Sequence, residues 1–323
     1  MTKPKIYITD SEFSNNHIEE AIIENAGGEL IGLQCKTAEE IIEKCQDAFG
    51  LINQYAPIDS KVLAALPKLK VVSRMGIGVN NIDVDAANKN KIYVANVPDG
   101  SVDEVSNHAF ALFMCCLRRL VTLNKAIRRG EWGIGSAVPV HRASAVKLGL
   151  MSFGRIPQKL AEKVKVLGVQ ILVYDPYIPK TFIEEKGAKS VTFEEILKES
   201  DYISIHTPLT PDTQHLFSIH EFQMMKNTAY IINTSRGAII DEKALIEALR
   251  NKEIAGAALD VYETEPIARD NPLLHMDNVI ATPHSAWYSE EALVEIRSKT
   301  ALNIVDVMEN KTPRYFFNKK AFQ

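Results

Sequence analysis

The stretch that decides the fold reads Gly149-Leu150-Met151-Ser152-Phe153-Gly154-Arg155-Ile156-Pro157. It lies between a strand-like run that begins at Leu148 and an amphipathic run over 156–167, which predicts a strand, a tight turn and a helix. Such a turn places backbone N–H groups at the start of a helix, where they can bind a pyrophosphate. The fingerprint is partial, because Ser152 and Pro157 stand where the dinucleotide-binding pattern has its first and third glycines. Alone, it fits a plain strand-to-helix turn equally well.

An acidic residue at a suitable distance favours the phosphate-binding interpretation. Asp175 lies twenty-one positions after Gly154, at the end of the next strand-like run, 171–174. A carboxylate there can accept hydrogen bonds from the ribose hydroxyls of a dinucleotide, and it repels the additional phosphate of NADP. The sequence therefore predicts NAD as the cofactor. The turn residues expected at its phosphates are Phe153, Gly154, Arg155 and Ile156. The plainer alternative is that Asp175 only starts an Asp-Pro turn.

Short apolar runs alternate with amphipathic helical patterns on both sides of this turn. Upstream they cover 6–9, 30–33, 50–53 and 71–73, and downstream 171–174, 202–205, 230–232 and 257–259. Strands that alternate with helices form parallel sheets that are covered on both faces. The sequence therefore predicts an α/β fold with two successive series of strands and helices.

Two long helical patterns lie near the ends of these series. One runs from Val102 to Arg128, after the favourable N-cap Ser101, and the other runs from Ser289 to about Met308. Acidic residues in the first turn of each favour the positive end of the helix dipole. We expect both helices to connect two domains.

Composition narrows the class of protein. Of the 323 residues, 46% are hydrophobic and 24% charged, and the formal net charge is -4. These values predict a globular protein without a nucleic-acid or membrane partner. The four cysteines have no metal-ligand spacing, which predicts no metal site and a reducing compartment. Because residues 1–9 lack the apolar segment of a secretion signal, the expected location is cytoplasmic.

Three charged residues in the second series have the chemistry that reduction of a 2-keto acid requires. Arg236 follows a strand in the order Asn-Thr-Ser-Arg-Gly. Glu265 directly precedes a proline, and His284 directly follows a proline. Arginine can hold a carboxylate bidentately and polarise a keto oxygen, and histidine can donate a proton as the alkoxide develops. A carboxylate beside the imidazole orients it and favours its protonated form. Each residue taken alone also fits an ordinary surface or structural role.

With these motifs the chain resembles the D-isomer-specific 2-hydroxyacid dehydrogenase family over almost its whole length, from Arg74-Met75-Gly76-Ile77-Gly78 to the helix after His284. The catalytic residues of that family occur in N-x-x-R-G, E-P and P-H contexts, so the resemblance assigns these roles to Arg236, Glu265 and His284. Glu265 argues against the formate-oxidising branch, which has an amide there. The implied reaction is hydride transfer between NAD(H) and a small D-2-hydroxy acid or its 2-keto acid.

The same resemblance implies a domain organisation and further site residues. Two Rossmann-like, doubly wound parallel-sheet domains are expected, with the cofactor domain (101–290) inserted into a discontinuous substrate domain (1–100 and 291–323). The additional cofactor-binding residues that the resemblance implies are His206, Thr207, Pro208, Thr213, Thr234, Ser235 and Asp260. The implied substrate-binding residues are Arg74, Gly76, Ile77 and Trp287. The family also implies a homodimer.

Within the family, His284-Ser285-Ala286-Trp287-Tyr288-Ser289-Glu290-Glu291 resembles the C-terminal binding protein branch and its bacterial relatives. In that branch the arginine matching Arg74 meets the substrate carboxylate, and the tryptophan matching Trp287 lines the pocket. An aromatic face favours methylenes or a thioether over a phosphate, so we expect an apolar substrate side chain. The alternative for Trp287 is ordinary packing between domains.

Two other functions stay open from the sequence. The altered glycine turn and the resemblance to a corepressor branch also fit an NADH-responsive binding protein with little turnover. D-3-phosphoglycerate dehydrogenase shares the expected fold, although Trp287 is poorly suited to a phosphorylated substrate. The leading prediction is an NAD-dependent oxidoreductase whose partner is a small 2-hydroxy or 2-keto acid.

Overall fold

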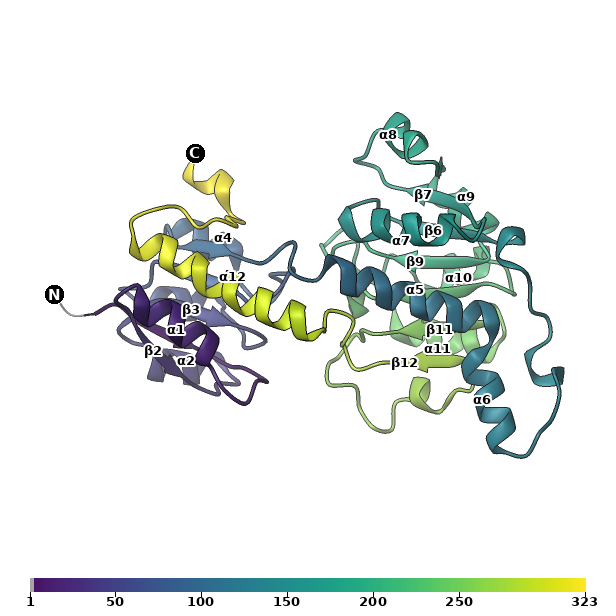
Figure 1. Ribbon diagram of the computed structural model, residues 1–323, viewed down its shortest axis with the longest axis horizontal. Helices are drawn as coiled ribbons and strands as arrows, with labels where there is room; N and C mark the ends of the chain where they lie inside the picture. The colour runs from purple at the N-terminus through teal and green to yellow at the C-terminus, as the bar shows by residue number, and fades with distance from the viewer. Residues whose placement is uncertain (1–2) are drawn as a thin grey trace. The chain divides into compact units, whose positions relative to one another are not determined.

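The computed structural model describes residues 3–323, and the chain divides into two compact units (Figure 1). The first unit consists of the chain up to Ser101 together with Tyr288–Gln323, and the second unit is Val102–Trp287. The second unit is therefore an insertion in the sequence of the first. Within the described residues, no helix has the length and apolar character needed to cross a membrane.

The first unit contains a five-stranded parallel sheet in the order β2-β1-β3-β4-β5. Its strands are β1 Lys5–Ile8, β2 Glu29–Gly32, β3 Ala48–Asn53, β4 Val71–Arg74 and β5 Tyr93–Ala95. Its α-helices are α1 His17–Asn25, α2 Ala38–Lys44, α3 Ser60–Ala65, α4 Val84–Lys89 and α12 Glu290–Met308. The strand order changes direction between β1 and β3, which makes that pair the topological switch point of this sheet.

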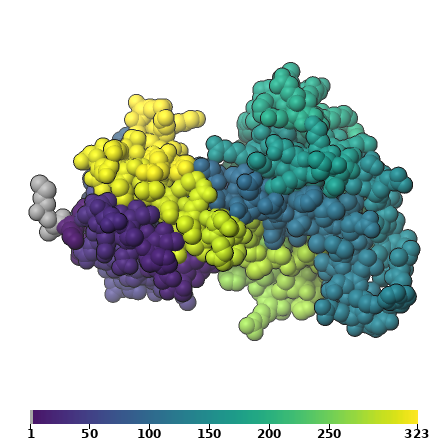
Figure 2. Space-filling view, in the orientation of Figure 1, coloured from purple at the N-terminus to yellow at the C-terminus, as the bar shows by residue number. Residues whose placement is uncertain are grey.

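Helix α12 holds the C-terminal segment in this unit. Arg297 on α12 is buried and donates to both carboxylate oxygens of Glu19 on α1, at 2.7 and 2.6 Å. The Ser73 hydroxyl on β4 donates to the Thr300 carbonyl of α12 at 3.0 Å. Figures 1 and 2 accordingly show the yellow C-terminal helix beside the purple N-terminal segment. The two ends of the chain thus complete one unit.

The second unit contains a seven-stranded parallel sheet in the order β12-β11-β10-β9-β6-β7-β8. Its strands are β6 Lys147–Met151, β7 Gln170–Tyr174, β8 Lys189–Ser190, β9 Tyr202–Ile205, β10 Tyr230–Asn233, β11 Gly256–Leu259 and β12 Val279–Ala281. Its α-helices are α5 Val102–Arg118, α6 Leu120–Arg128, α7 Arg155–Lys165, α8 Lys180–Glu185, α9 Phe193–Glu199, α10 Ile219–Met224 and α11 Glu242–Arg250. The direction of the strand order changes between β6 and β9.

Two buried apolar clusters cover the opposite faces of this second sheet. Neighbouring residues of β10 belong to different clusters, Ile231 to one and Ile232 to the other, and successive side chains of a strand point to opposite faces. The sheet is therefore covered on both sides. The predicted fold class, two doubly wound parallel-sheet domains with one inserted into the other, is confirmed.

The prediction of one continuous helix from Val102 to Arg128 is wrong. Helix α5 ends before Arg119, which adopts the left-handed conformation with φ 54°, and α6 begins after it. The Arg119 guanidinium lies 4.6 Å from the centre of the Tyr230 ring, a cation–π contact with a distant strand. By contrast, the C-terminal helix begins as predicted, because the Ser289 side chain caps the N–H of Ala292 at 2.9 Å.

Candidate active site

The carboxyl edge of the seven-stranded sheet carries three neighbouring loops, which follow β10, β11 and β12. Parallel strands end at the same edge, so residues that are distant in sequence meet there. The loop after β10 carries Arg236, the loop after β11 carries Glu265, and the loop after β12 carries His284. All three candidate catalytic residues therefore lie in one region of the second unit.

His284 and Glu265 form a direct pair. The imidazole Nδ1 lies 2.6 Å from Glu265 Oε2, and about a third of each side chain is exposed (30% and 33%). The second carboxylate oxygen, Oε1, accepts the backbone N–H of Tyr262 at 2.9 Å. Burial raises the pKa of Glu265, but its two donors and the charge of Arg236 outweigh burial and hold that pKa below its usual value. Because the ionised carboxylate accepts a hydrogen bond from Nδ1–H, Nε2 is the imidazole atom left to exchange a proton with a ligand.

The backbone around Arg236 is fixed by the asparagine that ends β10. Asn233 donates from its side-chain amide to the Arg236 carbonyl at 2.8 Å and accepts the Ser235 N–H at 3.0 Å. The guanidinium Nη1 of Arg236 donates to the Ser235 carbonyl at 2.6 Å. Burial lowers the pKa of Arg236, and the charge of Glu265 acts in the opposite direction. The guanidinium and the carboxylate therefore act on each other electrostatically.

A glycine brings the Arg236 and Glu265 loops into contact. A Cβ at Gly237 would lie 1.8 Å from the carbonyl carbon of Tyr262 and 1.9 Å from its oxygen. Real side chains do not approach a backbone so closely. Tyr262 also donates the N–H that holds Glu265. The absence of a side chain at position 237 therefore sets the distance between the two candidate catalytic loops.

The buried residue Asp260 fixes the backbone of the His284 loop by hydrogen bonds. Its carboxylate is fully buried and accepts from the Thr282 hydroxyl at 2.6 Å and from the backbone N–H groups of Ser285 and Ala286 at 3.0 and 2.9 Å. Its backbone carbonyl accepts the His284 N–H at 2.8 Å. These bonds hold His284 at φ 51°, a conformation that residues other than glycine seldom adopt. Asp260 is among the cofactor-binding residues that the resemblance implies, and its hydrogen bonds give it a second, positioning role.

The glycine turn between β6 and α7 has an unusual backbone at its first position. Ser152 adopts φ 75°, where the dinucleotide-binding pattern has a glycine. Its N–H donates to the Tyr174 carbonyl at 2.8 Å, and its hydroxyl lies 3.2 Å from the Thr207 hydroxyl. Helix α7 begins at Arg155 without a side-chain cap, and the space next to Gly154 is open to 4 Å. The start of this helix is therefore accessible to a phosphate.

Asp175 ties the turn after β7 to the glycine turn. One carboxylate oxygen accepts the Phe153 N–H at 2.8 Å, and the other accepts the N–H groups of Tyr177 and Ile178 at 2.8 and 3.1 Å. The Asp-Pro turn foreseen as an alternative is thus present. A carboxylate has about four acceptor positions, so one remains for a ribose hydroxyl.

The loops after β9 and β10 carry most of the remaining cofactor candidates. The Ser235 hydroxyl donates to the Thr207 carbonyl at 2.5 Å and joins the two loops. Within the loop after β9, the Thr213 hydroxyl donates to the Pro208 carbonyl at 2.7 Å. These four residues therefore form a connected edge beside the glycine turn.

Two further side chains at this edge bear on whether a dinucleotide fits. Burial lowers the pKa of His206 to about 3, so this imidazole is neutral beside the Ser204 hydroxyl, 2.9 Å away. The Thr234 hydroxyl is buried and has no hydrogen-bond partner within residues 3–323. Such a group is expected where a bound ligand supplies the hydrogen-bond partner. Together with the open helix start at Gly154 and the free acceptor position of Asp175, these groups fit NAD.

The candidate substrate residues are divided between the two units. Arg74 ends β4 in the first unit, and Gly76 follows it with φ 136°. A Cβ at Gly76 would lie 1.8 Å from the Arg74 guanidinium, so glycine leaves the space that this side chain fills. The Ile77 carbonyl is held by the Asn96 side chain at 2.6 Å. Trp287 is half-buried at the end of the second unit.

Comparisons with known proteins agree with this geometry. The sequence model of the family "D-isomer specific 2-hydroxyacid dehydrogenase, NAD binding domain" matches residues 110–286. This chain belongs to that family. It is 38% identical to a glyoxylate reductase of Korarchaeum cryptofilum over 284 residues, which cover 87% of this chain and 86% of the relative. It is 41% identical to a D-3-phosphoglycerate dehydrogenase of Methanocaldococcus jannaschii over 258 residues, which cover 79% of this chain but only 49% of that relative.

A solved structure shows the same likeness. The D-lactate dehydrogenase of Aquifex aeolicus, complexed with NAD and lactic acid, has a TM-score of 0.86 and 27% identity, covering 94% of this chain and 96% of its own. The 2-hydroxyacid dehydrogenase described here is therefore an NAD-dependent oxidoreductase that acts on a CH–OH group. The family and the cofactor that the sequence predicted are confirmed.

Sequence reasoning missed His108, a residue of this dehydrogenase that supports the His284 loop. The His108 imidazole on α5 lies 3.0 Å from the Thr282 hydroxyl and 3.6 Å from the Asp260 carboxylate. Helical spacing predicts only which face of α5 carries His108. Its contact with a loop that is 174 residues later depends on the tertiary fold.

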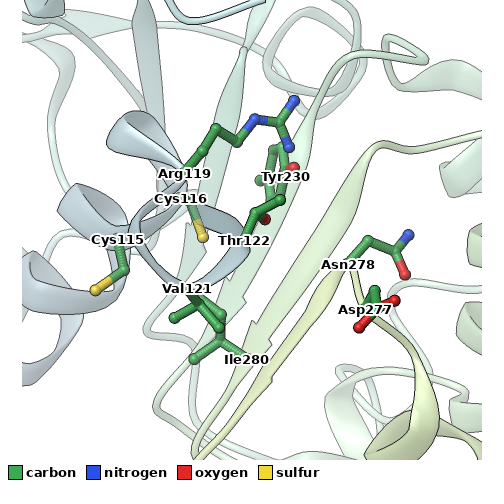
Figure 3. Close-up of a pocket in the computed structure, with 9 residues that line it drawn as sticks. All are labelled: Cys115, Cys116, Arg119, Val121, Thr122, Tyr230, Asp277, Asn278 and Ile280. Carbon is green, nitrogen blue, oxygen red and sulfur yellow. The ribbon is translucent and has the colours of Figure 1, made fainter. Parts of the chain in front are cut away.

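A small pocket elsewhere in the second unit is separate from this site. Figure 3 shows it between the start of α6, Tyr230 and Asn278. Tyr230 opens β10 and Asn278 precedes β12, so the pocket lies at the amino ends of strands whose carboxyl ends carry the catalytic candidates. It takes no part in the site.

Proposed function

We propose that this chain reduces a small 2-keto acid to the D-2-hydroxy acid, with Arg236, Glu265 and His284 as its catalytic residues. The observation that carries the proposal is the 2.6 Å pair between His284 and Glu265, together with the contact between the Glu265 loop and the Arg236 loop at Gly237. NADH bound at the glycine turn supplies the hydride. Arg236 binds the substrate carboxylate and polarises the keto oxygen, because a partly buried guanidinium offers parallel donors and a fixed charge.

The arrangement of the His284–Glu265 pair determines which atom donates a proton to the substrate. Glu265 is ionised, accepts from Nδ1 of His284 and stabilises the imidazolium. Nε2 then donates its proton to the oxygen that becomes the hydroxyl, and the imidazole is left neutral. In the opposite direction the neutral imidazole accepts the same proton. Glu265 keeps its charge throughout and acts by orienting His284.

A spectrophotometric screen of 2-keto acids with NADH and with NADPH tests the proposal. We expect turnover of at least one of glyoxylate, pyruvate and a longer aliphatic keto acid. NADH should be preferred by about tenfold or more, because the Asp175 carboxylate repels the additional phosphate of NADPH. Binding of NADH without turnover of any acid would favour the NADH-responsive binding protein. A preference for 3-phosphohydroxypyruvate would favour phosphoglycerate dehydrogenase.

We further propose that the substrate carries an apolar side chain, which Trp287 contacts. Trp287 lies three residues after His284, and it follows directly the Ser285 and Ala286 amides that Asp260 holds. An aromatic ring on so firmly held a segment gains from burying methylenes or a thioether.

Replacement of Trp287 by alanine should therefore lower kcat/KM for a longer aliphatic or thioether keto acid about tenfold more than for glyoxylate. The phenylalanine variant keeps an aromatic face and should recover most of the difference. Steady-state kinetics on glyoxylate, pyruvate and the longer acid measure the effect. An equal loss on all three acids, with a lower melting temperature, would show that Trp287 only packs.

Three finer expectations about this chain stay predictions. The resemblance to the C-terminal binding protein branch and the cytoplasmic location rest on the sequence alone. The homodimer has structural support in a group of exposed apolar side chains on α6 and the segment after it. These are Leu120, Ile127, Trp132, Ile134 and Val138, and Trp132 is 93% exposed. A second copy of the chain would remove such a surface from water.

A further inference from the structure

The first unit has its own topological switch point, between β1 and β3. In open parallel sheets, ligands bind outside the carboxyl ends of the strands at the place where the strand order changes direction. In this sheet that place is formed by the loop after β1, which carries Asp10 and Glu12, and by the loop after β3, which carries Gln54 and Tyr55. Arg74 ends the adjacent strand β4 at the same edge.

Glu12 and Tyr55 are held together at this edge. Glu12 Oε1 accepts from the Gln54 side-chain amide at 2.7 Å and from the Tyr55 hydroxyl at 3.2 Å. The Glu12 N–H donates back to the Gln54 side-chain oxygen at 3.0 Å. Glu12 is exposed, and Tyr55 is 49% exposed. The pair therefore presents a carboxylate and a phenol in fixed positions to whatever occupies the edge.

A buried carboxylate beneath the pair makes it rigid. Asp10 is nearly inaccessible and accepts the backbone N–H groups of Gln54 and Tyr55, at 3.3 and 2.6 Å. It also accepts from the Thr9 hydroxyl at 2.7 Å and from the Asn53 side-chain amide at 3.2 Å. Both loops of the switch point are thus bonded to one side chain. A network with so many satisfied polar groups is characteristic of a preorganised site.

Charges of both signs act on this edge. Burial and the charge of Glu12 raise the pKa of Tyr55 and the charge of Arg74 lowers it, with a net rise to about 12. Glu12 and Arg74 are therefore both close enough to Tyr55 to perturb the same phenol. The edge offers one cation for a carboxylate and, beside it, one anion that repels a second carboxylate or a phosphate.

We propose that Glu12, held by Gln54 and Tyr55, excludes 2-keto acids with a second anionic group from the substrate site. The accepted class consists of monoanionic keto acids whose far end is uncharged, and the excluded class includes phosphorylated and dicarboxylic keto acids. The inference rests on the proposed function, in which Arg236 binds the keto acid, and on the contact with the substrate carboxylate that the resemblance implies for Arg74. It extends that function by assigning the discrimination to one side chain.

The test follows the charge at position 12. The quantity measured is the ratio of kcat/KM for 3-phosphohydroxypyruvate or 2-oxoglutarate to kcat/KM for pyruvate, with NADH. Glu12→Gln keeps the size and an acceptor oxygen for Gln54 and Tyr55, and it should raise the ratio about tenfold. Glu12→Lys should raise the ratio further. Added salt should reduce both effects, because an exposed charge is screened. Glu20→Gln, which removes an exposed charge from α1, is the matched control and should leave the ratio unchanged.

The outcomes separate this inference from the proposed function. If the wild-type enzyme reduces pyruvate and all three variants have the wild-type ratio of kcat/KM values, the role of Glu12 is overturned and the proposed function is not. A rise in Glu20→Gln equal to that in Glu12→Gln would reduce the effect to net charge and also overturn it. If the wild-type enzyme reduces no keto acid, the proposed function fails and this inference fails with it.

Discussion

Replacement of His284 by alanine should lower kcat/KM for keto acid reduction by about 100-fold to 10,000-fold, the range typical of a lost general acid. The physical reason is the loss of the imidazole whose Nδ1 lies 2.6 Å from the Glu265 carboxylate. The loss should appear in kcat, because proton donation matters only as the alkoxide develops. Stopped-flow or steady-state reduction with NADH measures the effect.

The left-handed backbone at position 284 requires a second variant. Asparagine tolerates φ near 51° better than alanine does, so His284→Asn separates the lost proton donor from a disturbed loop. Both variants should lose activity to the same extent. Near-wild-type activity in His284→Asn would remove His284 from the catalytic set, since asparagine cannot supply the proton.

Glu265→Gln belongs to the same prediction, because the pair acts as a unit. The double variant with His284→Ala should lose little more than His284→Ala alone. The activity should also depend on pH, and it should fall at low pH. Because the pKa of Glu265 is lowered by its partners, the pair is complete above the usual carboxyl range and is lost as the pH falls through the folded-state value.

Much of the fold and of the candidate site was predictable, because it depends on local patterns. Alternating runs fix which segments are strands, and parallel strands require every following loop to lie at one edge. The sequence therefore predicts that three residues that follow separate strands, Arg236, Glu265 and His284, lie at one edge of the sheet. The turn at Ser152 is an instructive case. Its sequence departs from the glycine pattern, yet its φ of 75° keeps the backbone that the pattern requires.

The remaining features depend on contacts between distant residues, which local patterns do not encode. The break at Arg119 accompanies its contact with the Tyr230 ring, and no helix signal within 102–128 foretells that partner. The hydrogen bonds of Asp260 to the Ser285 and Ala286 amides link strands whose pairing is set only in the folded sheet. The two-residue strand β8 is too short for its pattern to be seen.

Replacement of Gly237 by alanine should disrupt both stability and catalysis. The added Cβ would overlap the Tyr262 carbonyl carbon, at 1.8 Å, so one of the two loops must move. Overpacking of this kind costs about 1–3 kcal/mol of unfolding free energy, and more where the neighbour is backbone, which cannot rotate away as a side chain can. A displacement of about 1 Å at a catalytic group is sufficient to cost about 100-fold in rate.

Gly237→Ala should therefore lower the melting temperature by several degrees and kcat/KM by about 100-fold or more. The activity falls because the movement displaces Arg236 in one loop and, in the other, the Tyr262 N–H that holds Glu265. Gly135→Ala is the matched control, since a Cβ there meets nothing within 4 Å. It should change neither quantity. Thermal unfolding and NADH-dependent reduction measure the two effects. A stable Gly237→Ala enzyme with wild-type kinetics would show that the two loops are not held in contact, and Arg236 and Glu265 would then have to be positioned by other means.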